Sequence, residues 1–75
     1  MVSIGGTMTP VGGAARNFLR RVRLAGEPLH AEPDELALAQ ACIEAGYLRR
    51  VSSRLGLFAI TVDGVAYLDR VAGAH

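Results

Sequence analysis

A chain of 75 residues can enclose only one hydrophobic core, and this chain has a single cysteine, Cys42, so no internal disulfide can reinforce that core. Hydrophobic residues make up 51% of the sequence and charged residues 20%, which is the composition of a folded globular domain. The core of so small a domain supplies only about 3–5 kcal/mol of net stability. Self-association is therefore an open route to further stability.

Several classes of protein are not indicated by the sequence. His30 and His75 are far apart with no carboxylates grouped near them, so we expect no metal site and no cofactor. The longest uncharged run, residues 1–15, is glycine-rich and resembles neither a membrane span nor a secretory signal. We expect a cytoplasmic protein without membrane contact, with residues 1–8 as a flexible leader and residues 9–75 as one domain. The net charge of +1 does not by itself indicate a polyanionic partner.

A first helix is predicted after Thr9-Pro10, a pair that is typical of a helix start. Gly12 and Gly13 weaken its first turn, so firm helix is expected from about Ala14. Gly26 is the expected end of this helix. Apolar residues at i, i+3, i+4 and i+7 spacing define its buried face, which comprises Ala15, Phe18, Leu19 and Val22.

A second helix is predicted over 33–45, because Pro33 suits the first helical position and Gly46 suits the residue after the end. After Gly46, Tyr47 is expected to fold back onto Cys42. Residues 27–32 are expected to form the loop before this helix. The wide apolar stripe of the helix comprises Leu36, Leu38, Ala39, Cys42 and Ile43.

Residues 47–52 and 57–62 are rich in β-branched and aromatic side chains, and turn-forming residues 53–56 lie between them. This pattern predicts an antiparallel hairpin. Thr61 stands where a helix N-cap is expected, so a short final helix should follow the hairpin. The inner face of that helix comprises Val65, Leu68, Val71 and Ala72. The predicted fold class is α+β.

Two segments resemble the winged helix-turn-helix domain of bacterial transcription regulators. EAGYLRR, residues 44–50, resembles the "xxGYLxR" junction between recognition helix and wing, and FAITVDGVAYL, residues 58–68, is similar to the "Y-x-L-T-x-x-G-x-x-x-L" wing-to-helix signature. The similarity covers about 36–71 and implies two main helices, a two-stranded antiparallel wing and a short C-terminal helix. The helix ahead of the recognition helix is either reduced to one turn around 29–31 or missing.

The resemblance implies a small DNA-binding, regulator-like protein and no enzyme. Arginines of the wing would contact the DNA backbone, with help from the first helix, and Gln40 could contact adenine. The predicted nucleic-acid-binding residues are Arg49, Arg50, Arg54, Arg16, Arg20 and Gln40.

The outward face of the second helix has two carboxylates and no arginine, which does not suit DNA; it comprises Asp34, Ala37, Gln40, Ala41 and Glu44. The alternative is therefore a protein-interaction module that does not bind DNA. It would use this acidic face or exposed leucines, and a homodimer is one form of it. Catalysis has little support, because His30 has no nucleophile placed near it by a known motif, and Cys42 lies on the apolar stripe.

Overall fold

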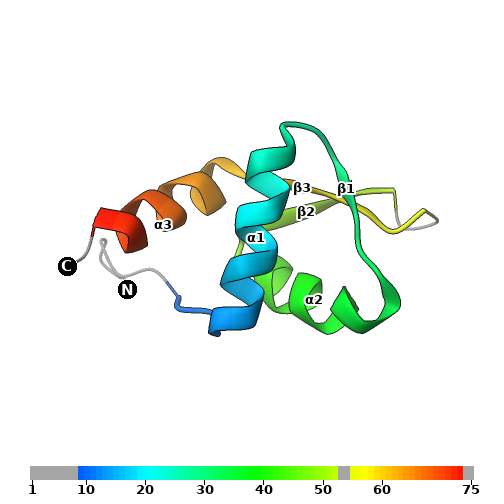
Figure 1. Cartoon of the computed structure of the whole chain (residues 1–75), viewed down its shortest axis with the longest axis horizontal. Helices are drawn as coiled ribbons and strands as arrows, with labels where there is room; N and C mark the ends of the chain where they lie inside the picture. The colour runs from blue at the N-terminus through cyan, green and yellow to red at the C-terminus, as the bar shows by residue number, and fades with distance from the viewer. Residues whose placement is uncertain (1–8, 53–54, 74–75) are drawn as a thin grey trace, which may run out of the picture.

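The structure, a computed structural model, describes residues 9–52 and 55–73 (Figure 1). In Figure 1, helix α1 crosses the middle of the molecule, the strands extend to one side of it, and α3 extends to the other. The α+β layout expected from the sequence is confirmed, with one strand more than expected. In chain order the elements are α1 (Gly13–Ala25), β1 (Leu29–His30), the 3-10 turn η1 (Pro33–Glu35), α2 (Leu36–Glu44), β2 (Leu48–Ser52), β3 (Leu57–Ile60) and α3 (Val62–Gly73).

Helix α1 begins at Gly13, and Gly12 stands at its N-cap in an extended conformation. The expectation of firm helix from about Ala14 agrees with this start, whereas Thr9-Pro10 precedes the helix and does not open it. The carbonyl of Thr9 accepts a hydrogen bond from the Tyr47 hydroxyl. The predicted end is confirmed: Gly26 adopts a left-handed φ of 69°. The predicted buried face is also confirmed and comprises Ala15, Phe18, Leu19 and Val22.

The segment expected to be a loop contains strand β1, so the sheet has three strands in the order β1-β3-β2. Leu29 pairs with Phe58 and His30 with Leu57, and the Ala31 amide donates to the Gly56 carbonyl at 3.0 Å. The helical turn considered for 29–31 is therefore wrong. A strand of two residues is too short to show a periodic pattern, and its partner lies almost 30 residues further on.

Pro33 opens a 3-10 turn, and the α-helix proper begins only at Leu36. Glu32 and Glu35 form a reciprocal capping box around this turn. The side chain of Leu36, expected in the apolar stripe, is 48% exposed. The glycine stop is confirmed as a Schellman motif: the Gly46 amide donates to Ile43 at 2.9 Å, and the Tyr47 amide donates to Cys42 at 2.8 Å.

Strands β2 and β3 form the predicted antiparallel hairpin, with Leu48 opposite Ile60 and Arg50 opposite Phe58. These pairs share one face of the sheet, because directly opposed residues lie on the same side. Arg49 and its partner Ala59 lie on the other face. Strand β3 ends at Ile60, two residues before the predicted end, because the next residue caps α3.

The core joins α1, α2 and the sheet to α3 through two stacked aromatic rings. Tyr47 and Tyr67 have ring centroids 4.4 Å apart, at an interplanar angle of 12°. The Tyr47 hydroxyl donates to the carbonyl of Thr9, and the amide of Val11 donates to the Tyr67 hydroxyl at 3.2 Å. We call residues 9–11, held by these two hydroxyls, the N-terminal clasp. No helix in the described part of the chain is long and apolar enough to cross a membrane.

Candidate functional site

The outward face of α2 and the start of β2 form one continuous polar surface. Arg50 Nη2 donates to Gln40 Oε1 at 2.9 Å, and Gln40 Nε2 donates to Glu44 Oε2 at 3.1 Å. All three residues are exposed. The structure therefore brings two of the predicted nucleic-acid-binding residues, Gln40 and Arg50, into direct contact.

The outward face of α2 is otherwise as the helical spacing predicts, with Asp34 before it and small side chains between its polar ones. Ala37 and Ala41 are exposed beside Gln40. Small side chains leave the helix backbone open to close approach by a partner. The face has no arginine of its own, so Arg50 from the neighbouring strand is its cationic contribution.

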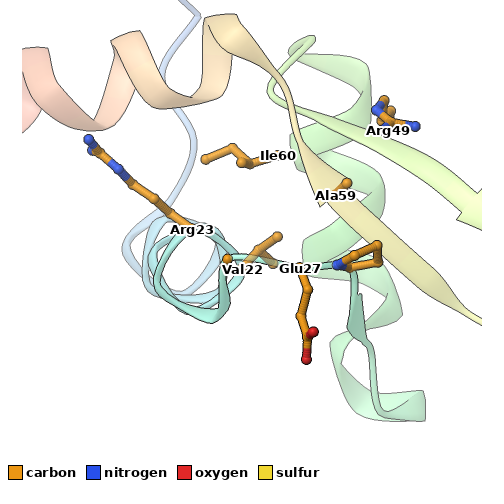
Figure 2. Close-up of a pocket in the computed structure, with 8 residues that line it drawn as sticks. Val22, Arg23, Glu27, Arg49, Ala59 and Ile60 are labelled. Carbon is orange, nitrogen blue, oxygen red and sulfur yellow. The ribbon is translucent and has the colours of Figure 1, made fainter.

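Arg49 points to the opposite face of the sheet and lines a groove of about 280 Å³ between the end of α1 and strand β3. Figure 2 shows Arg49 and Arg23 at two ends of this groove, with their guanidinium groups directed away from each other. Among the residues that the structure describes, Arg49 has no carboxylate oxygen within 4 Å. Arg49 and Arg50 therefore lie on two different faces of the β2–β3 hairpin.

The predicted nucleic-acid-binding arginines of α1 lie apart from the β2–β3 hairpin. Arg20 lines a second groove, of about 370 Å³, formed by α1 and α3, and donates to Asn17 Oδ1 at 2.8 Å. Arg23, on the same side of α1, pairs with Asp69 at 2.8 Å. Arg16 is half-buried. Arg54, the remaining predicted residue, lies outside the described residues.

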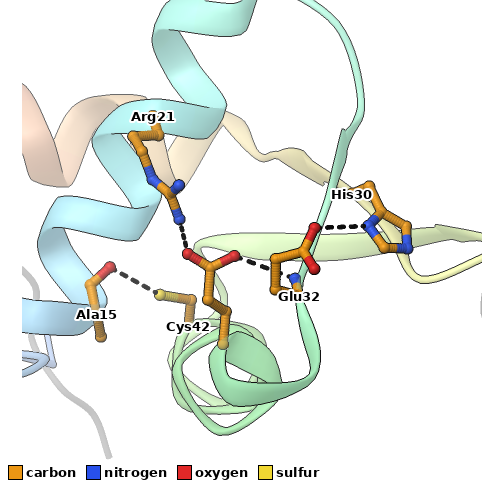
Figure 3. A network of polar contacts seen from close by, with 6 residues as sticks. Ala15, Arg21, His30, Glu32 and Cys42 are labelled. Carbon is orange, nitrogen blue, oxygen red and sulfur yellow. Dashed lines mark hydrogen bonds and ion pairs between the residues drawn. The ribbon is translucent and has the colours of Figure 1, made fainter.

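Arg21, which the sequence analysis did not single out, connects α1 to the start of α2 (Figure 3). Its guanidinium pairs with the Glu35 carboxylate and lies 5.2 Å from the centroid of the Phe18 ring. The Glu35 carboxylate also accepts the Glu32 amide, and this backbone hydrogen bond, followed by Arg21, lowers the pKa of Glu35. Arg21 and Glu35 are 14 positions apart, so no local pattern in the sequence predicts the pair.

The residues considered for catalysis are arranged without a reactive geometry. His30 Nδ1 lies 3.7 Å from Glu32 Oε2, and both side chains are exposed (Figure 3). Cys42 is buried, its thiol lies 3.6 Å from the Ala15 carbonyl, and burial raises the pKa of that thiol. Within residues 9–52 and 55–73, no three His, Cys, Asp or Glu side chains group as metal ligands would.

Comparisons with known protein families, with curated proteins and with solved structures found nothing that matches this chain.

Proposed function

We propose that this chain is a winged-helix domain that binds duplex DNA, chiefly through phosphate contacts made by arginines of β2. The observation that carries the proposal is the 2.9 Å contact between Arg50 and Gln40. It joins the first strand of the wing to the outward face of the helix that the resemblance assigns to the major groove. Helix and wing can then meet one duplex as a single surface.

Arg50 keeps most of its hydrogen-bonding capacity for a ligand. A guanidinium has five N–H donors, and Gln40 accepts from only one of them. The side chain is exposed and lies on a short strand, so its free edge can make the bidentate contact that suits a phosphate. Arg49 supplies a second cation from the other face of the same strand. There it can reach phosphates of the DNA backbone that lie beside the wing.

The charge distribution favours weak binding with a modest dependence on salt concentration. Arg21 and Arg23 are neutralised by Glu35 and Asp69, so they add little to the field at the wing. Each phosphate that a cation neutralises contributes about −0.9 to the slope of log affinity against log salt concentration. Two wing arginines therefore correspond to a slope of about −2 before any contribution from the rest of the chain.

The test is fluorescence anisotropy of a labelled random-sequence duplex, titrated with the protein at several salt concentrations. The double variant Arg49→Ala, Arg50→Ala should bind more weakly at every sequence, and its salt slope should be shallower by about 2. Arg70→Ala is the control: it removes one positive charge from an exposed site on α3, against two in the double variant, and it matches either single variant in charge. Equal loss in the control and the double variant would place binding elsewhere, and absence of binding at low salt would reject the proposal.

A second candidate function, protein binding by self-association, is supported by a different surface. Leu24 is 84% exposed beside the α1–α3 groove, where Leu68 and Ala72 add apolar lining. The groove is also lined by Arg20 and Arg23, and the charge of Arg23 is neutralised by Asp69, so the apolar residues can meet the same patch of a second copy across a two-fold axis. Sedimentation equilibrium should then give a dimer that Leu24→Ser converts to a monomer. A monomeric wild-type protein at high micromolar concentration would reject this candidate.

A further inference from the structure

The amide of Gln40 is held at both of its ends. Its nitrogen donates to Glu44 Oε2 at 3.1 Å, across one turn of α2, and its oxygen accepts from Arg50 Nη2 at 2.9 Å, across to β2. A free glutamine side chain has three rotatable bonds and loses their freedom on binding. In this arrangement the two neighbours fix the side chain and define which end is nitrogen and which is oxygen.

The two contacts leave half of the hydrogen-bonding capacity of the Gln40 amide unused. A glutamine amide has two N–H donors and two acceptor lone pairs, and each neighbour takes one. One donor and one acceptor therefore remain on an exposed side chain, between the small side chains of Ala37 and Ala41. In the major groove, adenine presents the complementary pair, the N7 acceptor and the N6 amino donor.

We propose that Gln40 recognises an adenine in the major groove, and that Glu44 is a positioning residue that orients the Gln40 amide for it. This inference rests on the proposed function. It adds recognition of a base to binding that otherwise depends on contacts with the DNA phosphates. Adenine is favoured over guanine because the common guanine contact is an arginine or lysine, and α2 has neither on its outward face.

The experiment selects bound duplexes from a pool with 20 random base pairs, using the wild-type protein, Gln40→Ala and Glu44→Ala. Wild-type selection should enrich an adenine at one position, and Gln40→Ala should lose that enrichment. Replacing the selected adenine by 7-deazaadenine, which keeps Watson–Crick pairing but lacks N7, should weaken wild-type binding about tenfold. The same replacement should leave the affinity of Gln40→Ala unchanged.

Glu44→Ala separates positioning from a merely structural role. Removing this carboxylate lessens repulsion of phosphates, so affinity for unselected DNA should hold or rise, while preference for the selected adenine should fall. Equal melting temperatures would show that each exposed substitution leaves the fold intact. Binding without an enriched adenine, or full enrichment in Gln40→Ala, would overturn base recognition and leave the backbone proposal standing. Absence of DNA binding by the wild type would reject both.

Discussion

At the scale of single residues, Gly64 is the described glycine with the least room for an added side chain. A Cβ atom added there would lie inside van der Waals contact with the carbonyl oxygen of Tyr47 and 2.7 Å from Cγ1 of Ile60. The backbone of α3 thus packs directly against the junction between α2 and β2. This contact gives a physical reason for a glycine at position 64.

Gly64→Ala should lower the free energy of unfolding by about 2 kcal/mol, because backbone and not a flexible side chain obstructs the added methyl group. Urea denaturation of both proteins measures the difference. Gly73→Ala is the control: it makes the same change in the same helix, where a Cβ atom would meet nothing within 4 Å. If the two variants were equally stable, the close approach of α3 to Tyr47 would be wrong.

Thr61 joins two helices through one hydroxyl. Its Oγ1 donates to the Gly46 carbonyl at 2.7 Å and accepts from the Gly64 amide at 3.0 Å, so it caps α3 and fixes the end of α2 together. Thr61→Val keeps the shape and removes both bonds, and it should lower the free energy of unfolding by about 1–2 kcal/mol. Thr61→Ser keeps the hydroxyl and should retain most of the stability. Thermal or urea denaturation that finds Thr61→Ser as unstable as Thr61→Val would contradict this role.

At the scale of elements, the turn η1 depends on a carboxylate that must be charged. The backbone hydrogen bond from Glu32, and then Arg21, lower the pKa of Glu35 below its ordinary value of 4.5. A lowered folded-state pKa stabilises the protein above the unfolded-state pKa, and this stabilisation is lost as the pH falls through the folded-state value. The start of α2 is therefore sensitive to acid.

Glu35→Gln should reduce the loss of stability on acidification below pH of about 4.5, since the amide cannot be protonated in that range. Urea midpoints measured from pH 7 to pH 3 give the comparison. Glu27→Gln removes a carboxylate that forms no ion pair among the described residues, so its acid dependence should follow the wild type. A Glu35→Gln curve parallel to the wild type would remove Glu35 from the acid response.

Periodic and capped elements could be predicted from the sequence, and paired or short ones could not. The apolar spacing of α1, the Gly46 stop and the Thr61 cap are local signals, and the structure confirms all three. Strand β1 exists only because β3 pairs with it, and the 3-10 form of η1 depends on the capping box at Glu32. Leu36, the first residue of α2, directly follows that turn and is exposed.

The candidate site also has features that the local sequence predicts and features that depend on tertiary packing. Helical geometry alone placed Gln40 on the outward face of α2, whereas the contact between Gln40 and Arg50 depends on how β2 packs beside that helix. Adjacent positions in a strand point to opposite faces, so Arg49 and Arg50 could not form one cluster once both lay in β2. The fold places the arginines of α1 away from the β2–β3 hairpin, and no local sequence pattern predicts this separation.

At the scale of the whole molecule, the buried thiol and the buried phenol limit the fold at alkaline pH. Burial raises the pKa of Cys42 above its ordinary 9.0 and that of Tyr47 above 10.0. For an acid with a raised folded-state pKa, stability is full below the unfolded-state value and falls as the pH rises toward the folded-state value. The free energy of unfolding should therefore begin to decline near pH 9.

Cys42→Ala should shift the start of this alkaline decline upward, toward the titration of Tyr47, although it also removes some packing at every pH. Urea denaturation from pH 7 to pH 10.5 measures both effects. Thiol labelling of the wild type provides an independent control, because a core thiol should react only as fast as the fold opens. Labelling at the rate of a free cysteine would show that Cys42 is accessible.

The N-terminal clasp determines when this domain can be completed during synthesis. Val11 and Tyr67 are 56 positions apart, and Thr9 and Tyr47 are 38 apart. The ribosome makes residues 9–11 before either tyrosine, and one of the two hydroxyls that hold them arrives only with α3. Until that helix leaves the exit tunnel, the Val11 amide lacks its hydroxyl acceptor and the Tyr47 ring has no partner to stack on. The N-terminal clasp is therefore completed only after α3 has emerged.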